Sequence, residues 1–286
     1  MSTRRAALAS LVALGAPALS GCGAARAIFR GADRAHGCVD VRVPARSGVN
    51  VLRGVIPTRH VAARVHYAIA LPAGARGIDR VAYLLPGRGG TADALTGLGF
   101  DGFLAEYLRN GGVPFAIAAM DSGESYYHRR LSGEDRLAVA MVDLPEVVRG
   151  VLGVSRLREA LLGQSMGGYG ALLAAEREPR RFRAVAVAGP AIFPSYEDEN
   201  RSVGDAFDSA GDYARNDVTA HAARLRDTPV RIAAGTRDPF LPGIRIFARA
   251  HPAAHVVVAT GCHDDGFWRA SAAASVAFVA AHLTRR

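Results

Sequence analysis

The stretch 161–170, LLGQSMGGYG, places a serine at the centre of a G-x-S-x-G pentapeptide. The apolar residues before it predict a strand, and the small residues 166–176 predict a helix. So sharp a turn strains its central residue, and the positions two before and two after it must be very small. Gly163 and Gly167 occupy these positions. Ser165 is therefore predicted to project its hydroxyl above the strand ends as a nucleophile; the strand and helix context disfavours the alternative, an ordinary serine in a packing turn.

A serine nucleophile needs a general base, and the base needs a carboxylate to orient it. Asp238, in GTRDPF, directly follows the apolar run 230–234, and His263, in GCHDDG, follows the run 255–259. Both residues lie downstream of Ser165 at the expected carboxyl ends of strands. The sequence therefore predicts a catalytic triad of Ser165, Asp238 and His263.

Other histidines and carboxylates fit these roles less well. His251 and His255 precede or open the last predicted strand, and His282 lies in the final predicted helix. We interpret these histidines as solvated or core imidazoles. Asp264 and Asp265 adjoin the histidine in the same loop and would rarely reach the back of its ring, so one of them is expected to cap the last helix.

An oxyanion hole needs two backbone N–H groups that converge on one point. Met166 follows the nucleophile and supplies one, at a helix N-terminus that favours developing negative charge. The glycine-rich turn 84–90, LLPGRGG, is expected to supply the other from Arg88, with Gly87 as the next choice. The same turn completes neither G-x-G-x-x-G nor a P-loop, which disfavours a nucleotide cofactor.

The rest of the chain alternates apolar runs with helical patterns, as expected of an α/β fold with a mainly parallel sheet covered on both faces. One domain is predicted over 42–286. The polar segment 194–226 breaks this alternation and is interpreted as an inserted cap or an irregular crossover. Strands are expected at 64–71, 81–85, 115–120, 159–163, 184–188, 230–234 and 255–259, and helices at 93–109, 137–151, 166–176 and 266–283.

Composition restricts the class of protein. The chain has 286 residues, of which 50% are hydrophobic and 21% charged, so a disordered chain is excluded. No apolar run reaches the 18 or more residues of a membrane span, which excludes a polytopic membrane protein.

The net charge of +9 comes entirely from scattered arginines without interleaved aromatics. Nucleic acid is therefore not an expected partner, whereas attraction to an anionic envelope surface accounts for the charge.

The N-terminus has the pattern of an export signal. Arg4 and Arg5 precede a short apolar stretch, and Leu19-Ser20-Gly21-Cys22 resembles the lipobox of bacterial lipoproteins. We expect residues 1–21 to be a signal peptide, Cys22 to carry a lipid anchor to the membrane, and 22–41 to be a tether. The expected location is the cell envelope, on the outer face of the cytoplasmic membrane, or secretion. A plain secretory signal with a chance cysteine is the alternative.

With Cys22 assigned to the lipid, two cysteines remain. Outside the cytoplasm Cys38 and Cys262 can pair, which would join the N-terminal segment to the loop that carries His263. Two unpaired small core residues are the alternative, because the sequence does not establish the separation of the two residues.

Four motifs together resemble the esterase D-like branch of the α/β-hydrolases, which includes S-formylglutathione hydrolases, feruloyl esterases and secreted mycolyltransferases. They are YLLPGRGG at 83–90, GQSMGGYGALL at 163–173, GTRDPF at 235–240 and GCHD at 261–264. The resemblance covers about 61–283. The sequence differs from the branch at Pro86, where many members have histidine before the glycine of the oxyanion turn.

The resemblance implies a serine esterase that acts through an acyl-enzyme on a small-molecule, lipid or sugar ester, with no metal and no organic cofactor. An acyltransferase acting on envelope glycolipids and a non-catalytic envelope-binding protein on the same scaffold are the alternatives. The segment 121–127, DSGESYY, resembles the branch's post-strand substrate loop. Packing in the core would explain Tyr126 and Tyr127 equally well. The oligomeric state is not predicted.

Overall fold

The computed structural model describes residues 38–285. The expected signal peptide, the expected lipidation site Cys22 and most of the expected tether lie outside the described residues. Two of the last residues of that tether contact the domain, Cys38 through a disulfide to Cys262 and Asp40 through a hydrogen bond from Arg269.

The described chain is built around an eight-stranded sheet with the strand order β1-β2-β4-β3-β5-β6-β7-β8. The strands from β4 to β8 in this order run parallel, whereas β2 pairs antiparallel with both β4 and β1. The strands are β1 (Val49–Ile56), β2 (Val65–Pro72), β3 (Arg80–Leu85), β4 (Ala116–Met120), β5 (Arg158–Gln164), β6 (Phe182–Ala188), β7 (Val230–Gly235) and β8 (His255–Ala259).

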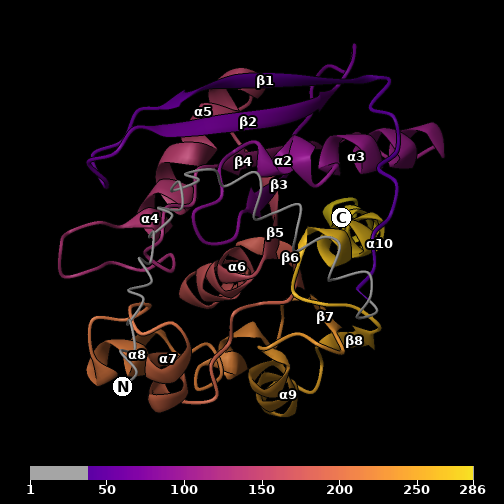
Figure 1. The fold of residues 1–286 in the computed structure, drawn as a ribbon. Helices are drawn as coiled ribbons and strands as arrows, with labels where there is room; N and C mark the ends of the chain where they lie inside the picture. The colour runs from indigo at the N-terminus through magenta and orange to yellow at the C-terminus, as the bar shows by residue number, and fades with distance from the viewer. Residues whose placement is uncertain (1–37, 286) are drawn as a thin grey trace, which may run out of the picture. The chain divides into compact units, whose positions relative to one another are not determined.

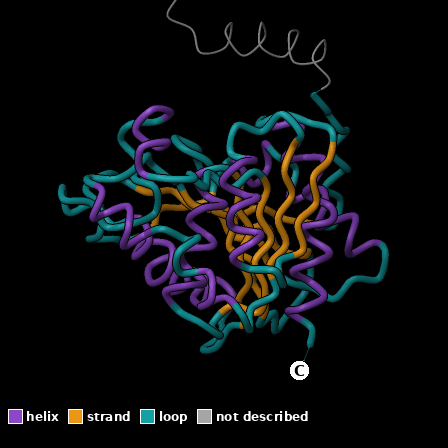
Figure 2. Tube along the Cα trace, turned by 90° about the horizontal axis from the view of Figure 1, so that it is seen from below, coloured by secondary structure: helices purple, strands orange, loops and turns teal. Residues whose placement is uncertain are grey.

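Helices cover both faces of the sheet (Figures 1 and 2). Each face has its own hydrophobic core. Neighbouring strand residues point to opposite faces. Val81 and Tyr83 accordingly join one core, with residues of α5 (Leu144–Leu152), α6 (Met166–Arg177) and α9 (Leu241–Ala250). The intervening residues join the other core, with residues of α2 (Ala94–Gly97), α3 (Phe100–Arg109) and α10 (Asp265–Leu283). This arrangement explains why the central strands are apolar throughout.

Two expected helices are interrupted. The span expected at 93–109 is divided into α2 and α3 at Gly99, whose φ of 77° is in the left-handed region. The span expected at 137–151 contains α4 (Arg136–Ala138), a π-helical turn η1 (Val139–Asp143) and α5. Pro145 at the start of α5 has no N–H to donate to the preceding turn, which is where the π-helical turn lies.

Strand β1 was not predicted, because its exposed positions do not alternate strictly with buried ones. It forms an edge of the sheet, and its pairing with β2 along the whole length of both strands holds it there. Gly54 is required at its centre, because a Cβ there would collide with the ring of Tyr67.

The segment 194–226 makes up most of the connection between β6 and β7. It contains α7 (Tyr196–Ser202), α8 (Ala210–Asn216) and the 3-10 helix η2 (Ala222–Leu225). Ser195 and Ser209 cap the two α-helices by accepting hydrogen bonds from the N–H groups of Asp198 and Asp212. The helices are only seven residues long, which explains why helical periodicity did not reveal them.

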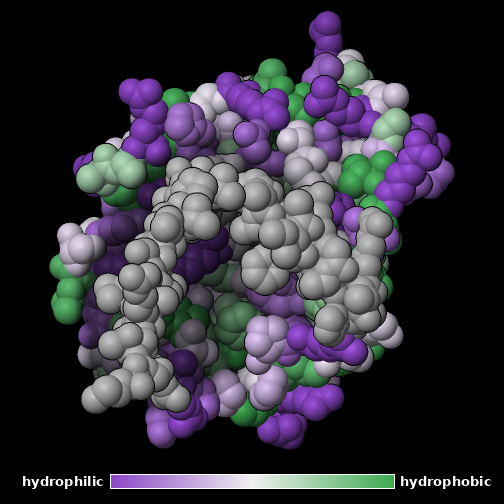
Figure 3. All heavy atoms as spheres, viewed as in Figure 1, coloured by the Kyte–Doolittle hydropathy of each residue, from purple (hydrophilic) through white to green (hydrophobic). Residues whose placement is uncertain are grey.

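The described residues include no helix that is both long and apolar enough to cross a membrane. On the face of the domain in Figure 3, hydrophobic residues lie between hydrophilic ones wherever the described residues are visible.

Candidate active site

Ser165 lies at the turn between β5 and α6. Its φ of 54° and ψ of −126° place a non-glycine residue in a strained conformation. Backbone crowds this turn from both sides: a Cβ at Gly163 would collide with the carbonyl of Gly167, and a Cβ at Gly167 would collide with that of Leu85. The turn therefore requires glycine at both positions.

The structure brings Ser165, Asp238 and His263 together. His263 Nε2 lies 2.8 Å from Ser165 Oγ, and His263 Nδ1 lies 3.0 Å from Asp238 Oδ2. Asp238 is 4% exposed, and its Oδ1 accepts a hydrogen bond of 2.9 Å from the N–H of Phe240. The carboxylate is thus held from two sides, and the ring is oriented with one nitrogen toward the serine hydroxyl.

Two aromatic residues contact the ring of His263. Phe240 lies 5.0 Å from it between ring centres, and Trp268 lies 5.3 Å away with the two rings nearly perpendicular. Trp268 is the single tryptophan of the chain. These contacts restrict rotation of the imidazole and leave its two nitrogens directed at Ser165 and Asp238.

Gly189, directly after β6, makes room for the pair of Asp238 and His263. Its φ is 53°, and a Cβ there would lie 2.5 Å from Asp238 Oδ2 and 3.0 Å from His263 Nδ1. Sequence reasoning missed this residue. A glycine immediately after an apolar strand run, in VAVAGP, was the available signal.

The turn expected to complete the oxyanion hole lies beside Ser165. A Cβ at Gly87 would be 3.3 Å from the Cβ of Ser165. Gly89 N–H donates to Gly123 O at 2.8 Å, and Gly90 N–H donates to Gly87 O at 2.9 Å.

Three amides around Ser165 remain available for a ligand. The hydrogen bonds of residues 38–285 include none donated by the N–H groups of Gly87, Arg88 or Met166. Arg88 and Met166, the two donors expected from the sequence, are therefore free to bind an oxyanion, and so is Gly87.

The side chain of Arg88 joins three segments. Its Nη2 lies 2.6 Å from Asp205 Oδ2, in the β6–β7 connection, and 3.2 Å from Glu124 Oε2, in the loop after β4. The hydrogen bond that Arg88 donates to Asp205 is the largest cause that raises the pKa of Arg88. The predicted oxyanion turn is thereby fastened to both segments.

Cys38 and Cys262 form a disulfide with 5.1 Å between their Cα atoms. Arg269, in the first turns of α10, donates to Asp40 at 3.1 Å. Residues 38–40 are thus attached to the loop that precedes α10 and carries the predicted base. Asp264 lies close to both sulfurs, but sulfurs bonded to each other do not offer thiolate ligands to a metal.

The residues that were weighed against the triad have other roles. Asp264 accepts a hydrogen bond of 2.8 Å from the N–H of Phe267 and caps α10, which confirms one expected cap. His251 is buried at the end of α9, where burial lowers its pKa. His282 packs on Phe278 within α10.

Of the two alternatives for the tyrosines after β4, the structure favours packing. Both Tyr126 and Tyr127 are almost fully buried. Tyr126 contacts the rings of Phe193 and Tyr169, and the hydroxyl of Tyr127 donates to Pro86 O at 3.2 Å.

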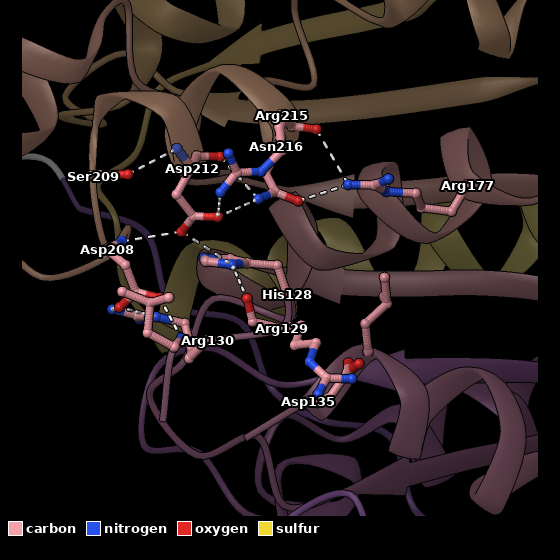
Figure 4. Close-up of a pocket in the computed structure, with 12 residues that line it drawn as sticks. His128, Arg129, Arg130, Asp135, Arg177, Asp208, Ser209, Asp212, Arg215 and Asn216 are labelled. Atoms are coloured by element: carbon pink, nitrogen blue, oxygen red, sulfur yellow. Dashed lines mark hydrogen bonds and ion pairs between the residues drawn. The ribbon is translucent and has the colours of Figure 1, made fainter. Parts of the chain in front are cut away.

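A polar cavity of about 500 Å³ lies between residues 128–137 and α8 (Figure 4), and its lining does not include Ser165, Asp238 or His263. Its polar side chains mostly bind one another. His128 Nε2 donates to Ala206 O at 2.9 Å, and Arg130 pairs with Asp208. These contacts hold the β6–β7 connection against the loop after β4.

Comparisons with known proteins identify the family of the chain. The Esterase family model, described as "Putative esterase", matches residues 128–274. The S-formylglutathione hydrolase of Paracoccus denitrificans (strain Pd 1222) is 34% identical over 113 residues, which are 38% of this chain and 40% of that protein. The match to this relative therefore spans less than half of its length.

Solved structures share the fold at low identity. A ferulic acid esterase superposes with a TM-score of 0.71 at 18% identity, covering 82% of this chain and 98% of that one. An S-formylglutathione hydrolase from Agrobacterium tumefaciens gives 0.70 at 16% identity, covering 86% and 99%. MPT51 (FbpC1) of Mycobacterium tuberculosis gives 0.67 at 17% identity, covering 82% and 99%. The expected α/β-hydrolase fold is confirmed.

Proposed function

The chain belongs to the Esterase family of α/β-hydrolases, and from this premise we propose that it is a serine esterase that cleaves carboxylic esters through an acyl-enzyme on Ser165. The observation that carries the proposal is the continuous line of two hydrogen bonds, 2.8 Å from Ser165 to His263 and 3.0 Å from His263 to Asp238. Nucleophile, base and orienting acid are then in place before a substrate binds.

In the first half of the reaction, Ser165 Oγ attacks the ester carbonyl carbon while its proton passes to His263 Nε2. Asp238 stabilises the imidazolium that forms, without taking its proton. The carbonyl oxygen becomes an oxyanion, which the amides of Arg88 and Met166 stabilise. His263 then returns the proton to the alcohol oxygen as the ester bond breaks, and the acyl group remains on Ser165.

In the second half, water enters where the alcohol left. His263 removes a proton from this water as it attacks the acyl carbon, and the same amides stabilise the second tetrahedral intermediate. Collapse of the intermediate releases the carboxylic acid and returns the proton to Ser165. An acyltransferase would use these residues with an acceptor hydroxyl in place of water, so the product distinguishes the two activities.

The proposed substrate is a small-molecule ester. Two proteins of similar fold, a ferulic acid esterase and an S-formylglutathione hydrolase, support this class. We also propose an exported, envelope-attached location. The disulfide between Cys38 and Cys262 supports a non-reducing compartment.

The proposal is tested on the purified protein with a fluorophosphonate probe and with p-nitrophenyl esters of two to eight acyl carbons. We expect labelling and turnover in the wild type, and in Ser165→Ala a loss of kcat by a factor on the order of 10⁶, below detection. Ser125→Ala is the matched control, because Ser125 is also buried and its hydroxyl has no hydrogen-bond partner among residues 38–285. A folded wild type that neither labels nor turns over any ester would refute the catalytic proposal and favour the envelope-binding alternative.

A second arm adds an acceptor alcohol, such as a monosaccharide, to the same assay. Free acid as the main product supports the esterase. A transferred acyl ester formed faster than the acid would instead identify the acyltransferase.

A further inference from the structure

We propose that Ser122 is a positioning residue of this active site, whose hydroxyl orients the 87–90 turn so that the Arg88 N–H is directed at the oxyanion. The inference rests on the proposed function, because it assigns a role in the same reaction. Ser122 follows β4 and contacts none of the three triad residues by hydrogen bond. It would therefore act on the reaction only through the turn.

Ser122 binds the turn at both of its ends. Its side chain is fully buried, and its hydroxyl donates its one proton to Gly87 O, the nearest carbonyl, 2.6 Å from Oγ; Gly90 O lies 2.8 Å from the same Oγ. Its backbone N–H donates to Gly90 O at 2.9 Å. A single residue thus contacts the carbonyl that opens the turn and the carbonyl that closes it.

The hydrogen bond to Gly87 O acts on the direction of an N–H group, together with the bond that Gly90 N–H donates to the same oxygen. The carbonyl of Gly87 and the N–H of Arg88 belong to one peptide unit, which is planar and trans, so they point in opposite directions. With the oxygen held by Ser122, the Arg88 N–H must point away from Ser122. Gly87 itself is adjacent to Ser165, so this peptide unit lies at the nucleophile.

The next peptide unit of the turn is held from the same loop. Gly89 N–H donates to the carbonyl of Gly123 at 2.8 Å, and Gly89 has a φ of 64°. The two peptide units that flank Arg88 are therefore both fixed by residues 122 and 123. Catalysis by hydrogen-bond donors depends on such fixed orientation, because donors that must reorient stabilise the transition state less.

The test compares Ser122→Ala with the matched control Ser125→Ala. Both changes remove one buried hydroxyl from the same loop, but only the first removes contacts with the turn. Each protein is assayed with a pair of substrates that differ in one atom, a p-nitrophenyl ester and its thiono analogue with C=S. Amide donors stabilise a developing oxyanion better than the sulfur anion, so the ratio of the two rates reports on the oxyanion hole.

For Ser122→Ala we expect kcat on the normal ester to fall about 10- to 100-fold with KM within about twofold, the size of effect that misplaced catalytic groups produce. The preference for the normal ester over the thiono ester should fall by a similar factor. Ser125→Ala should leave kcat and this preference within about twofold of the wild type.

A folded Ser122→Ala protein with wild-type kcat would overturn the proposal, and so would an equal loss on both substrates, which indicates a general structural defect. If Ser122→Ala does not fold, Ser122→Cys replaces it; we expect a smaller loss with the same change of preference, and an unchanged preference would overturn the proposal. Turnover by the wild type that Ser165→Ala does not abolish would refute the proposed function and this inference with it.

Discussion

Helix α6, which follows the predicted nucleophile Ser165, carries a buried acid that makes folding stability depend on pH. Glu176 is 2% exposed, and neither of its carboxyl oxygens has a hydrogen-bond partner within residues 38–285. Its pKa is raised from 4.5 to about 9, mainly by burial; the carboxylate of Asp217 adds to the rise, and the charges of Arg224 and Arg177 oppose it. At neutral pH the folded protein therefore keeps a proton on Glu176 that the unfolded chain has lost.

The sign and size of the effect follow from this difference in bound protons. Between pH 4.5 and about pH 9 the folded state binds one proton more than the unfolded state at this residue. The contribution of Glu176 to the free energy of unfolding is then fully present below pH 4.5 and decreases as pH rises toward about 9, by about 1.4 kcal/mol per pH unit. From pH 6 to pH 8 the contribution of Glu176 falls by about 2.7 kcal/mol, a large share of the stability of an ordinary domain.

Glu176→Gln removes this ionisation while keeping the shape of the neutral acid. The free energy of unfolding is measured with urea for wild type and variant at pH 6, 7 and 8. From pH 6 to pH 8 the free energy of unfolding of the variant should rise by about 2.7 kcal/mol relative to that of the wild type. A constant offset between the proteins is irrelevant, because the prediction concerns the slope. Glu178→Gln, at an exposed position of the same region, controls for the change in net charge. Parallel curves for wild type and Glu176→Gln would refute the reasoning.

Two further predictions concern the surroundings of the triad. Gly189→Ala should lower kcat at least about 10-fold, because the new methyl group would collide with Asp238; Gly153→Ala, at a similar positive φ but in open space, should keep its activity despite some loss of stability. Cys38→Ser should lower the free energy of unfolding by about 2–5 kcal/mol, because the disulfide to Cys262 closes a long loop of the chain, with a sequence separation of 224. Urea unfolding measures this loss, and a Cys38→Ser protein as stable as the oxidised wild type would contradict it.

Much of the fold could be predicted from the sequence, because the deciding patterns are local. Seven of the eight strands appear as apolar runs between turn residues, and the positions of the predicted nucleophile, acid and base follow from strand ends. Ser165 is the clearest case. The glycines on either side of it show in the sequence alone how crowded the turn must be.

Other features of the protein were decided only by the tertiary structure, because they depend on contacts between segments that are distant in the chain. Arg88 meets Asp205 across 117 residues, and Ser122 meets Gly87 across 35, with no pattern in either segment that indicates its partner. The same holds for the edge strand β1, which is a strand because β2 lies beside it. The sequence by itself determined the α/β class, the predicted nucleophile and its candidate partners, since backbone sterics and hydrophobic periodicity act over a few residues. The orientation of the oxyanion turn, the clearance at Gly189 and the attachment of the β6–β7 connection required packing of the whole domain, because contacts between distant segments form only when the chain has folded.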